Sequence, residues 1–327
     1  MGRPVVLHPG ALGDVLLAVP ALRALRALRA QAPDHELVLA AQPRIGRLLA
    51  ALGVVDRPLD FDTLGLDALF AVDEPPERLR RLLTGARVVS WFGSRDAIFA
   101  HRLASLAPES VVASTVPAQR ITVWEHLLAS VAPFSAGAAS EEAWREPIAL
   151  REEIVDAGRR ALLDAGWDGT RPLVMLHAGA GGVAKRWPVE GFAEVAETVV
   201  DAVGADVVVH EGPADREAVA ALRAHLRVPA HALGHPALET LAGAMHHATL
   251  WIGNDSGVTH LAAGVGAPTL ALFTAANLAW RPWARAARVR VVRVDALAPS
   301  DVDAVIADAT DLLRWRGERA VAARGNG

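Results

Sequence analysis

A single lysine occurs among the basic residues of this chain. Lys185 lies in the stretch HAGAGGVAKRWPVEGF at residues 177–192, and all other members of the 33 Lys plus Arg residues are arginines. A lysine ammonium is a compact point charge, whereas the arginine guanidinium is a planar fork. Gly179, Gly181 and Gly182 leave room for a bulky anion. We expect Lys185 to bind a diphosphate and to neutralise charge growing on a phosphate leaving group. A surface lysine without function is the alternative.

A second group of polar residues lies in GNDSGVTH at residues 253–260. Asn254, Asp255 and Ser256 are residue types that begin helices. Gly257 lets the backbone approach a ligand, and His260 follows one turn later. The free N–H groups and the dipole of a helix N-terminus favour an anion. Asp255 would repel a diphosphate, so we assign it to capping the helix or to sugar hydroxyls. An ordinary helix cap beside a core histidine is the alternative.

The third candidate is Asp14, at the end of HPGALGD at residues 8–14. This loop has no lysine or arginine and lacks the Walker pattern. A carboxylate at a helix start serves either as a helix cap or as a general base that accepts a hydroxyl proton. From the residues alone both roles stay open for Asp14.

These loops fall within a regular alternation of apolar segments and helical patterns. We expect strand segments at 4–10, 35–41, 86–93, 172–179, 205–212, 249–254 and 268–274. We expect helices at 11–31, 44–52, 96–106, 121–132, 152–166, 187–203, 214–226, 237–248, 255–266 and 301–317. Pro20 falls inside the first helix and should kink it. Continuous apolar strands that alternate with helices indicate a parallel sheet covered on both faces.

The alternation runs twice, which predicts two doubly wound, Rossmann-like α/β domains at 1–150 and 151–327. The small, polar segment 135–147 reads as the linker. Ligands of such sheets bind outside the carboxyl ends of the strands. We therefore expect two domains that face each other across a cleft holding the ligand.

Composition excludes several classes of protein. The chain has 327 residues, 52% of them hydrophobic, a net charge of −4 and no cysteine. The acidic balance argues against nucleic-acid binding, and the missing cysteines exclude thiol nucleophiles and Cys-ligated zinc. Residues 261–280 carry no charge over a membrane-span length, but Gly264, Gly266 and Pro268 divide them into a helix, a turn and a strand. We expect a cytoplasmic protein.

The three loops together resemble glycosyltransferase family 9, the bacterial lipopolysaccharide heptosyltransferases of GT-B fold. The resembling pieces are GALGDVLLAVPALRALR, KRWPVEGFAEVAE, GPADRE, WIGNDSGVTHLAAGVGAPTLALF and WRPW, in order through most of the chain. The resemblance implies an inverting, metal-independent transfer of a heptose or related sugar from an ADP-sugar to a lipopolysaccharide inner-core acceptor. It implies no cofactor beyond the nucleotide-sugar substrate, and possible contact with the cytoplasmic face of the inner membrane.

The resemblance also implies roles for individual residues. Asp14 is similar to the proposed catalytic base, and Lys185 to the lysine that binds donor phosphate. The remaining donor-binding positions it implies are Gly181, Gly182, Asp215 at the donor ribose, Asp255, Ser256, Gly257 and His260. The N-terminal domain would take the acceptor, for which Gly13, Arg95, Arg102 and Arg120 are candidates. The final helix, about 301–317, would pack back on the N-terminal domain.

One departure from the family pattern keeps alternatives open. Members often have Ser or Thr in the loop before the lysine, and here the segment AGAGGVA has no hydroxyl. A transferase with another nucleotide-sugar and glycan, or a non-catalytic nucleotide-sugar-binding protein, is therefore retained. A dinucleotide-dependent oxidoreductase ranks below them, because HPGALGD lacks the G-x-G-x-x-G spacing.

Two metal-like patterns are set aside. DFD at 60–62 matches a short motif of metal-dependent transferases, and the pairs His231/His235 and His246/His247 lack accompanying carboxylates in ligand spacing. We expect no metal site.

Overall fold

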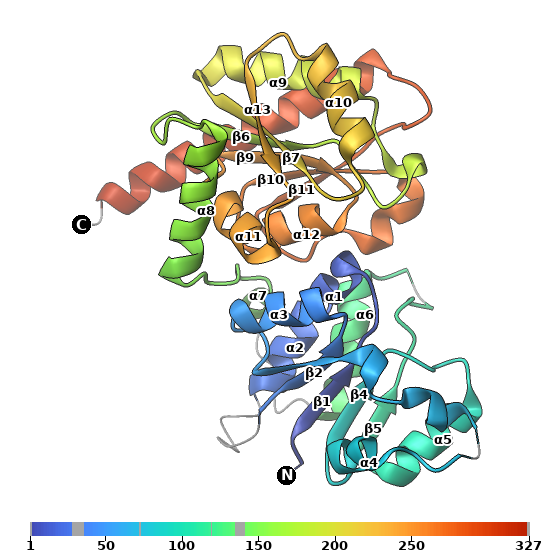
Figure 1. Cartoon of the computed structure of the whole chain (residues 1–327). Helices are drawn as coiled ribbons and strands as arrows, with labels where there is room; N and C mark the ends of the chain where they lie inside the picture. Colours follow the sequence, from blue (N-terminus) through green and yellow to red (C-terminus); the bar gives the residue numbers. More distant parts are fainter. Residues whose placement is uncertain (1, 28–35, 72, 119, 135–140, 326–327) are drawn as a thin grey trace. The chain divides into compact units, whose positions relative to one another are not determined.

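The structure is a computed structural model that describes residues 2–27, 36–71, 73–118, 120–134 and 141–325. The side chains of 141–142 and 315–325 lie outside the description. The chain divides into two compact units, Met1–Arg145 and Glu146–Gly327, where the sequence placed the boundary at residue 150. Each unit is a parallel sheet with helices on its faces (Figure 1).

The first unit contains a five-stranded parallel sheet in the order β3-β2-β1-β4-β5. Its strands are β1 (Pro4–Leu7), β2 (Val38–Ala41), β3 (Arg57–Asp60), β4 (Arg87–Ser90) and β5 (Ser110–Val112). Its helices are α1 (Leu12–Leu17), α2 (Val19–Arg26), α3 (Pro43–Ala51), α4 (Glu77–Leu83), α5 (Ala97–Leu106), α6 (Val123–Ser130) and α7 (Glu141–Trp144). The central strand β1 is fully buried, as expected of a strand covered on both faces.

The expected first helix is broken as Pro20 predicted. α1 ends at Leu17 and α2 begins at Val19, so Ala18 separates the two helices. Pro20 occupies the first turn of α2, where a missing backbone N–H costs no helical hydrogen bond. The predicted part beyond residue 27 lies outside the described residues.

The second unit contains a six-stranded parallel sheet in the order β11-β10-β9-β6-β7-β8. Its strands are β6 (Leu173–His177), β7 (Asp206–Glu211), β8 (Ala230–Gly234), β9 (Leu250–Asn254), β10 (Thr269–Phe273) and β11 (Ala287–Val291). Its helices are α8 (Glu152–Ala165), α9 (Val189–Val203), α10 (Arg216–His225), α11 (Leu238–His247), α12 (Gly257–Gly264) and α13 (Pro299–Gly325). This strand order is that of a dinucleotide-binding, doubly wound sheet.

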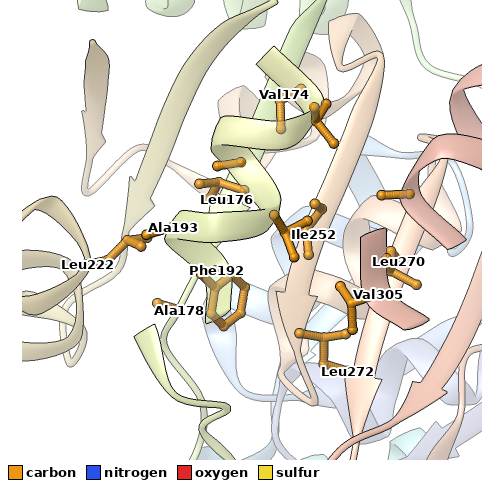
Figure 2. Close-up of a cluster of buried hydrophobic side chains, with 14 of the residues drawn as sticks. Val174, Leu176, Ala178, Phe192, Ala193, Leu222, Ile252, Leu270, Leu272 and Val305 are labelled. Atoms are coloured by element: carbon orange, nitrogen blue, oxygen red, sulfur yellow. The ribbon is translucent and has the colours of Figure 1, made fainter. Parts of the chain in front are cut away.

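The helices of the second unit cover its sheet on both faces. In Figure 1, α9, α10 and α13 lie on one side, and α8, α11 and α12 on the other. Figure 2 shows the first of these layers, in which Phe192 of α9 and Val305 of α13 pack on Leu176 and Ile252. Side chains alternate along a strand, so the intervening residues, such as His177 and Trp251, face the other layer.

The final helix is anchored to the second unit by its described residues. Val302, Val305, Ala309 and Leu312 are part of the hydrophobic core of this unit. Asp308, nearly buried, accepts hydrogen bonds from Arg290 Nε at 2.6 Å and Arg288 Nη1 at 3.2 Å. Packing of this helix on the first domain stays a prediction.

The uncharged segment 261–280 has the structure expected from its glycines. It forms the end of α12, a turn at Gly266 with a φ of 83°, strand β10 and a short 3-10 helix. Within the described residues, no helix is long and apolar enough to cross a membrane.

Candidate nucleotide-sugar site

The order of the strands determines where ligand loops gather in the second unit. β6 and β9 are neighbours at the centre of the sheet, and the chain proceeds from them toward opposite edges. Ligands of open α/β sheets bind at such a switch point, outside the carboxyl ends of the strands. The loop after β6 contains Lys185 and the loop after β9 contains Asp255, so the switch point brings together two of the predicted loops.

Lys185 and Asp255 form an ion pair at this edge. Lys185 Nζ lies 2.7 Å from Asp255 Oδ2, with the lysine side chain 40% exposed and the carboxylate 6% exposed. Asn277 Nδ2 donates a second hydrogen bond to the same oxygen at 2.8 Å. The sequence assigned Asp255 to capping α12 or to sugar hydroxyls. The structure shows that it caps no helix and instead orients Lys185.

Ser256 is the residue that caps α12. Its Oγ accepts a hydrogen bond from the backbone N–H of Thr259 at 3.3 Å, as an N-cap residue does. Gly257 is the first residue of the helix. The first turn of α12 therefore lies beside the Lys185–Asp255 pair, and its N-terminal partial charge adds to that of the ammonium.

His260 lies behind the ion pair as a neutral side chain. It is 5% exposed, and its Nε2 is 4.0 Å from Asp255 Oδ1. Burial lowers the pKa of His260 to about 4, against the opposing effect of the Asp255 carboxylate. His260 is therefore uncharged at neutral pH, and the Lys185 ammonium is the cation paired with Asp255.

Asn254 connects the two loops and was not among the predicted site residues. Its side chain is fully buried, its Oδ1 accepts a hydrogen bond from Trp187 N at 3.0 Å, and its Nδ2 donates to the carbonyl of Ala178 at 2.9 Å. The amide thus holds both ends of the lysine loop, residues 178–187, against the end of β9. The sequence signal was an Asn directly after an apolar strand, which we had interpreted only as a capping residue type.

The glycines of the lysine loop differ in their surroundings. A Cβ on Gly179 would lie 2.1 Å from Asp215 Oδ1, whereas a Cβ on Gly181 or Gly182 would meet nothing within 4 Å. Asp215 is 8% exposed and its Oδ2 accepts a hydrogen bond from Gly212 N at 3.0 Å. The expectation that Gly179 leaves room for an anion is wrong, because this glycine is needed for close packing against Asp215. Gly181 and Gly182 do border open space.

In the first unit, the corresponding switch point lies between β1 and β4, and the loop after β1 holds Asp14. Asp14 is the third residue of α1, and its Oδ2 accepts a hydrogen bond from Ala11 N at 3.3 Å. The capping contact that we had regarded as the alternative is thus present. Asp14 is partly exposed.

His8 supports the loop that holds Asp14. Its Nδ1 accepts a hydrogen bond from Gly10 N at 3.2 Å, and its ring lies edge-on to Trp91 with centroids 5.3 Å apart. Burial lowers the pKa of His8 to about 4, so the ring is neutral and can accept this bond. A Cβ on Gly10 would lie 2.7 Å from the imidazole, which explains a glycine at this position.

A hollow of about 410 Å³ opens beside this loop, at the carboxyl ends of β1, β2 and β3. Its lining residues are Pro9, Gln42, Pro43, Arg44, Phe61 and Asp62. It was not predicted, because its residues come from three loops that only the sheet brings together. Asp60, in the DFD pattern, accepts a hydrogen bond from Asp62 N at 3.2 Å.

The predicted acceptor residues lie on several elements of the first unit. Gly13 is in α1, Arg95 is exposed in the loop after β4, and Arg120 is exposed in the loop before α6. Arg102, on α5, donates a hydrogen bond to the carbonyl of Asp73. Their role in acceptor binding stays a prediction.

Comparison with solved structures shows which fold the chain shares with known proteins. The chain is similar over 95% of its length to a glycosyl transferase of family 9 from Veillonella parvula DSM 2008, with 20% identity, a TM-score of 0.73 and 97% of that chain covered. It is similar over 96% of its length to the ADP-heptose lps heptosyltransferase II of E. coli, with 19% identity, a TM-score of 0.72 and 99% of that chain covered. The E. coli heptosyltransferase WaaC with ADP follows, with 16% identity, 95% and 99% coverage and a TM-score of 0.64. The fold is thus that of the GT-B glycosyltransferases, as predicted.

The sequence of the second unit matches a family model. Residues 143–301 match the model of glycosyltransferase family 9 (heptosyltransferase), while a comparison with curated protein sequences found no match. The predicted resemblance to this family is confirmed over these residues, which make up just under half of the chain.

Proposed function

We propose that this glycosyltransferase moves a heptose, or a related sugar, from an ADP-sugar to the inner core of a lipopolysaccharide. The observation that supports the proposal most is Lys185, an ammonium held by Asp255 at the switch point and next to the first turn of α12. The similar E. coli structures are described as an ADP-heptose enzyme and as a heptosyltransferase with ADP.

In the proposed reaction, Asp14 accepts the proton of an acceptor hydroxyl. The freed oxygen attacks the anomeric carbon of the donor from the face opposite the nucleotide, so the configuration at that carbon inverts. The bond between this carbon and the diphosphate oxygen breaks, and ADP leaves with the bonding electron pair. Lys185 and the N–H groups at Ser256 and Gly257 stabilise the charge on the departing diphosphate, without a metal ion on the phosphates.

The remaining predicted residues take binding roles in this proposal. Asp215 meets the ribose of the donor, and Asp255 turns a carboxylate oxygen to the sugar while holding Lys185. The acceptor occupies the first unit near the hollow beside Asp14. A lipid-linked acceptor would bring the protein into peripheral contact with the cytoplasmic face of the inner membrane.

The test is a transfer assay with ADP-heptose and a heptose-deficient core acceptor, with mass spectrometry of the product. The proposal expects a product one heptose heavier, and loss of turnover in Asp14→Asn with unchanged ADP affinity. Product formed only from a UDP- or GDP-sugar would contradict the proposal that the donor is an ADP-sugar. Retained turnover in Asp14→Asn would contradict the assignment of Asp14 as the base.

One observation favours a donor other than an ADP-sugar. The lysine loop has no hydroxyl side chain between Ala178 and Ala184, so only backbone N–H groups accompany Lys185 there. We retain a GT-B transferase with another nucleotide-sugar and glycan as the second candidate. A non-catalytic nucleotide-sugar-binding protein would bind the nucleotide but form no product in any of these assays.

A further inference from the structure

A buried group of potential metal ligands lies behind the lysine loop. The register pairs Leu176 of β6 with Val209 of β7, so His177 and His210 follow as neighbours on the same face of the sheet. Their Nδ1 atoms are 3.1 Å apart, and the side chains are 2% and 3% exposed. Asp215, in the turn after β7, completes the group, and one ligand atom from each residue lies within 4.8 Å of the others.

We propose that His177, His210 and Asp215 bind a divalent transition-metal ion, with Zn²⁺ as the best-fitting ion. Two imidazole nitrogens and a carboxylate oxygen are a donor set that zinc accepts, with a fourth position left for water. Two nitrogens bound tetrahedrally at ~2.0–2.1 Å from zinc are roughly 3.3 Å apart. The two Nδ1 atoms are therefore already close to the spacing of ligands to one ion.

The contact between the two imidazoles has a consequence for metal binding. The Nδ1–Nδ1 hydrogen bond needs a proton on one of the two nitrogens. Binding of an ion by both Nδ1 atoms needs that proton to move to Nε2 of the same ring.

The backbone around Asp215 leaves its carboxylate room to reach the imidazoles. A Cβ on Gly179 would lie 2.1 Å from Oδ1, and a Cβ on Gly212 would lie 2.6 Å from Oδ2. Two glycines therefore surround this carboxylate. Trp251 packs against both rings, with centroids 6.0 Å from His177 and 6.1 Å from His210, and restricts their movement.

Nearby charges of both signs act on the site. The charge of Arg186 at His177 and that of His235 at His210 oppose the binding of a cation. The negative charge of the Asp215 carboxylate at His210 favours it. The ion would join the end of β6 to the start of α10 and thereby fix the lysine loop. It would take no part in the transfer step, in which Lys185 and backbone N–H groups face the diphosphate.

The experiment is a titration of chelator-treated full-length protein with Co²⁺ and Zn²⁺. Visible d–d absorption of Co²⁺ reports nitrogen coordination, and the absence of cysteine removes thiolates as a competing source. We expect saturation at one ion per chain, a zinc-dependent rise in Tm, and at least roughly tenfold weaker binding in His210→Gln and Asp215→Asn. His246→Gln, which changes an exposed histidine of α11, is the matched control and should bind as the unchanged protein does.

The same readouts can overturn the proposal. Absence of the cobalt band and of the zinc-dependent rise in Tm in the unchanged protein would contradict it. Equal binding by His210→Gln and the unchanged protein would place the ion elsewhere. Circular dichroism checks that each variant folds, and if His210→Gln does not, Asp215→Asn decides alone. None of these measurements depends on a donor or on turnover, so they are independent of the proposed function.

Discussion

The ion pair of Lys185 with Asp255 has a consequence for donor binding. A buried carboxylate that loses its partner is costly, so the ammonium is held in place before a ligand arrives. In the proposed function, the diphosphate of the donor would bind to this positioned cation and to the N-terminus of α12. We infer that Asp255 is a positioning residue for Lys185 as well as a candidate for contact with the sugar.

Replacing Lys185 with alanine tests its role in the transfer. The charge on the leaving group is greatest in the transition state, so we expect kcat to fall about 10²- to 10³-fold with a smaller change in the KM for the donor. Arg171→Ala, which removes an exposed positive charge from the same unit, is the control and should leave both constants unchanged. Unchanged turnover of Lys185→Ala at saturating donor would rule out this role.

The glycines of the lysine loop provide a matched pair of substitutions. Gly179→Ala places a Cβ 2.1 Å from Asp215 Oδ1, whereas Gly181→Ala places it in open space. We expect Gly179→Ala to displace Asp215 and to weaken nucleotide affinity at least roughly tenfold, about 1.4 kcal/mol. Gly181→Ala should change the affinity far less. Calorimetric titration with ADP measures both, and equal effects would show that the crowding at Asp215 is unimportant.

At the scale of elements, Asn254 joins the lysine loop to β9. Asn254→Ala leaves the N–H of Trp187 and the carbonyl of Ala178 without their partners in a buried place. We expect a loss of about 2 kcal/mol in the free energy of unfolding, together with weaker binding of ADP. Urea unfolding followed by circular dichroism measures the first effect. A variant as stable as the unchanged protein, with unchanged ADP affinity, would contradict this account.

Strands with continuous apolar runs could be predicted from the sequence, whereas edge strands without such runs could not. The buried strands β1, β6, β9 and β10 were located because continuous apolar runs end at glycine, asparagine or threonine. β11 and β8 were missed, because ARVRV alternates charged and apolar residues and AHALG is mostly polar or small. These are the edge strands of the sheet, which are paired on one side only and need no apolar run.

Only part of the candidate site could be predicted, because the sequence shows local patterns but not which distant residues meet. Lys185, Asp255 and Ser256 stand out locally by residue type and by position after a strand. Lys185 and Asp255 are 70 positions apart in the sequence. They come into contact because β6 and β9 are adjacent strands of the sheet. The same applies to His177 and His210, which are adjacent through the register of β6 and β7. The sequence analysis weighed only histidine pairs that are close along the chain, and His177 and His210 are 33 positions apart.

At the scale of the whole molecule, buried neutral histidines make the fold sensitive to acid. His8, His177, His210 and His260 have folded-state pKa values lowered to about 4 or below by burial. Between the unfolded pKa near 6.5 and these values, only the unfolded chain binds the proton, so stability falls as the pH falls. At pH 5 each histidine costs about 2 kcal/mol relative to pH 8.

The prediction is a steep loss of Tm from pH 7 to pH 5 in the presence of chelator. His260→Gln should show a shallower dependence than the unchanged protein, because one of the titrating groups is absent. His225→Gln, at an exposed site of α10, should keep the original slope. Differential scanning fluorimetry over a pH series measures all three, and identical slopes would contradict the burial of His260 as a neutral group.

The proposed function depends on binding of an adenosine diphosphate sugar by the second unit through Lys185. Calorimetric titration of the purified protein and of Lys185→Ala with ADP, UDP, GDP and NAD tests it most directly. The account predicts selective binding of ADP by the unchanged protein and weaker binding of ADP by the variant. Preference for UDP or GDP would contradict the proposed ADP-sugar donor. Binding of NAD alone, or equal ADP affinity of the two proteins, would contradict the assignment of the nucleotide site to Lys185.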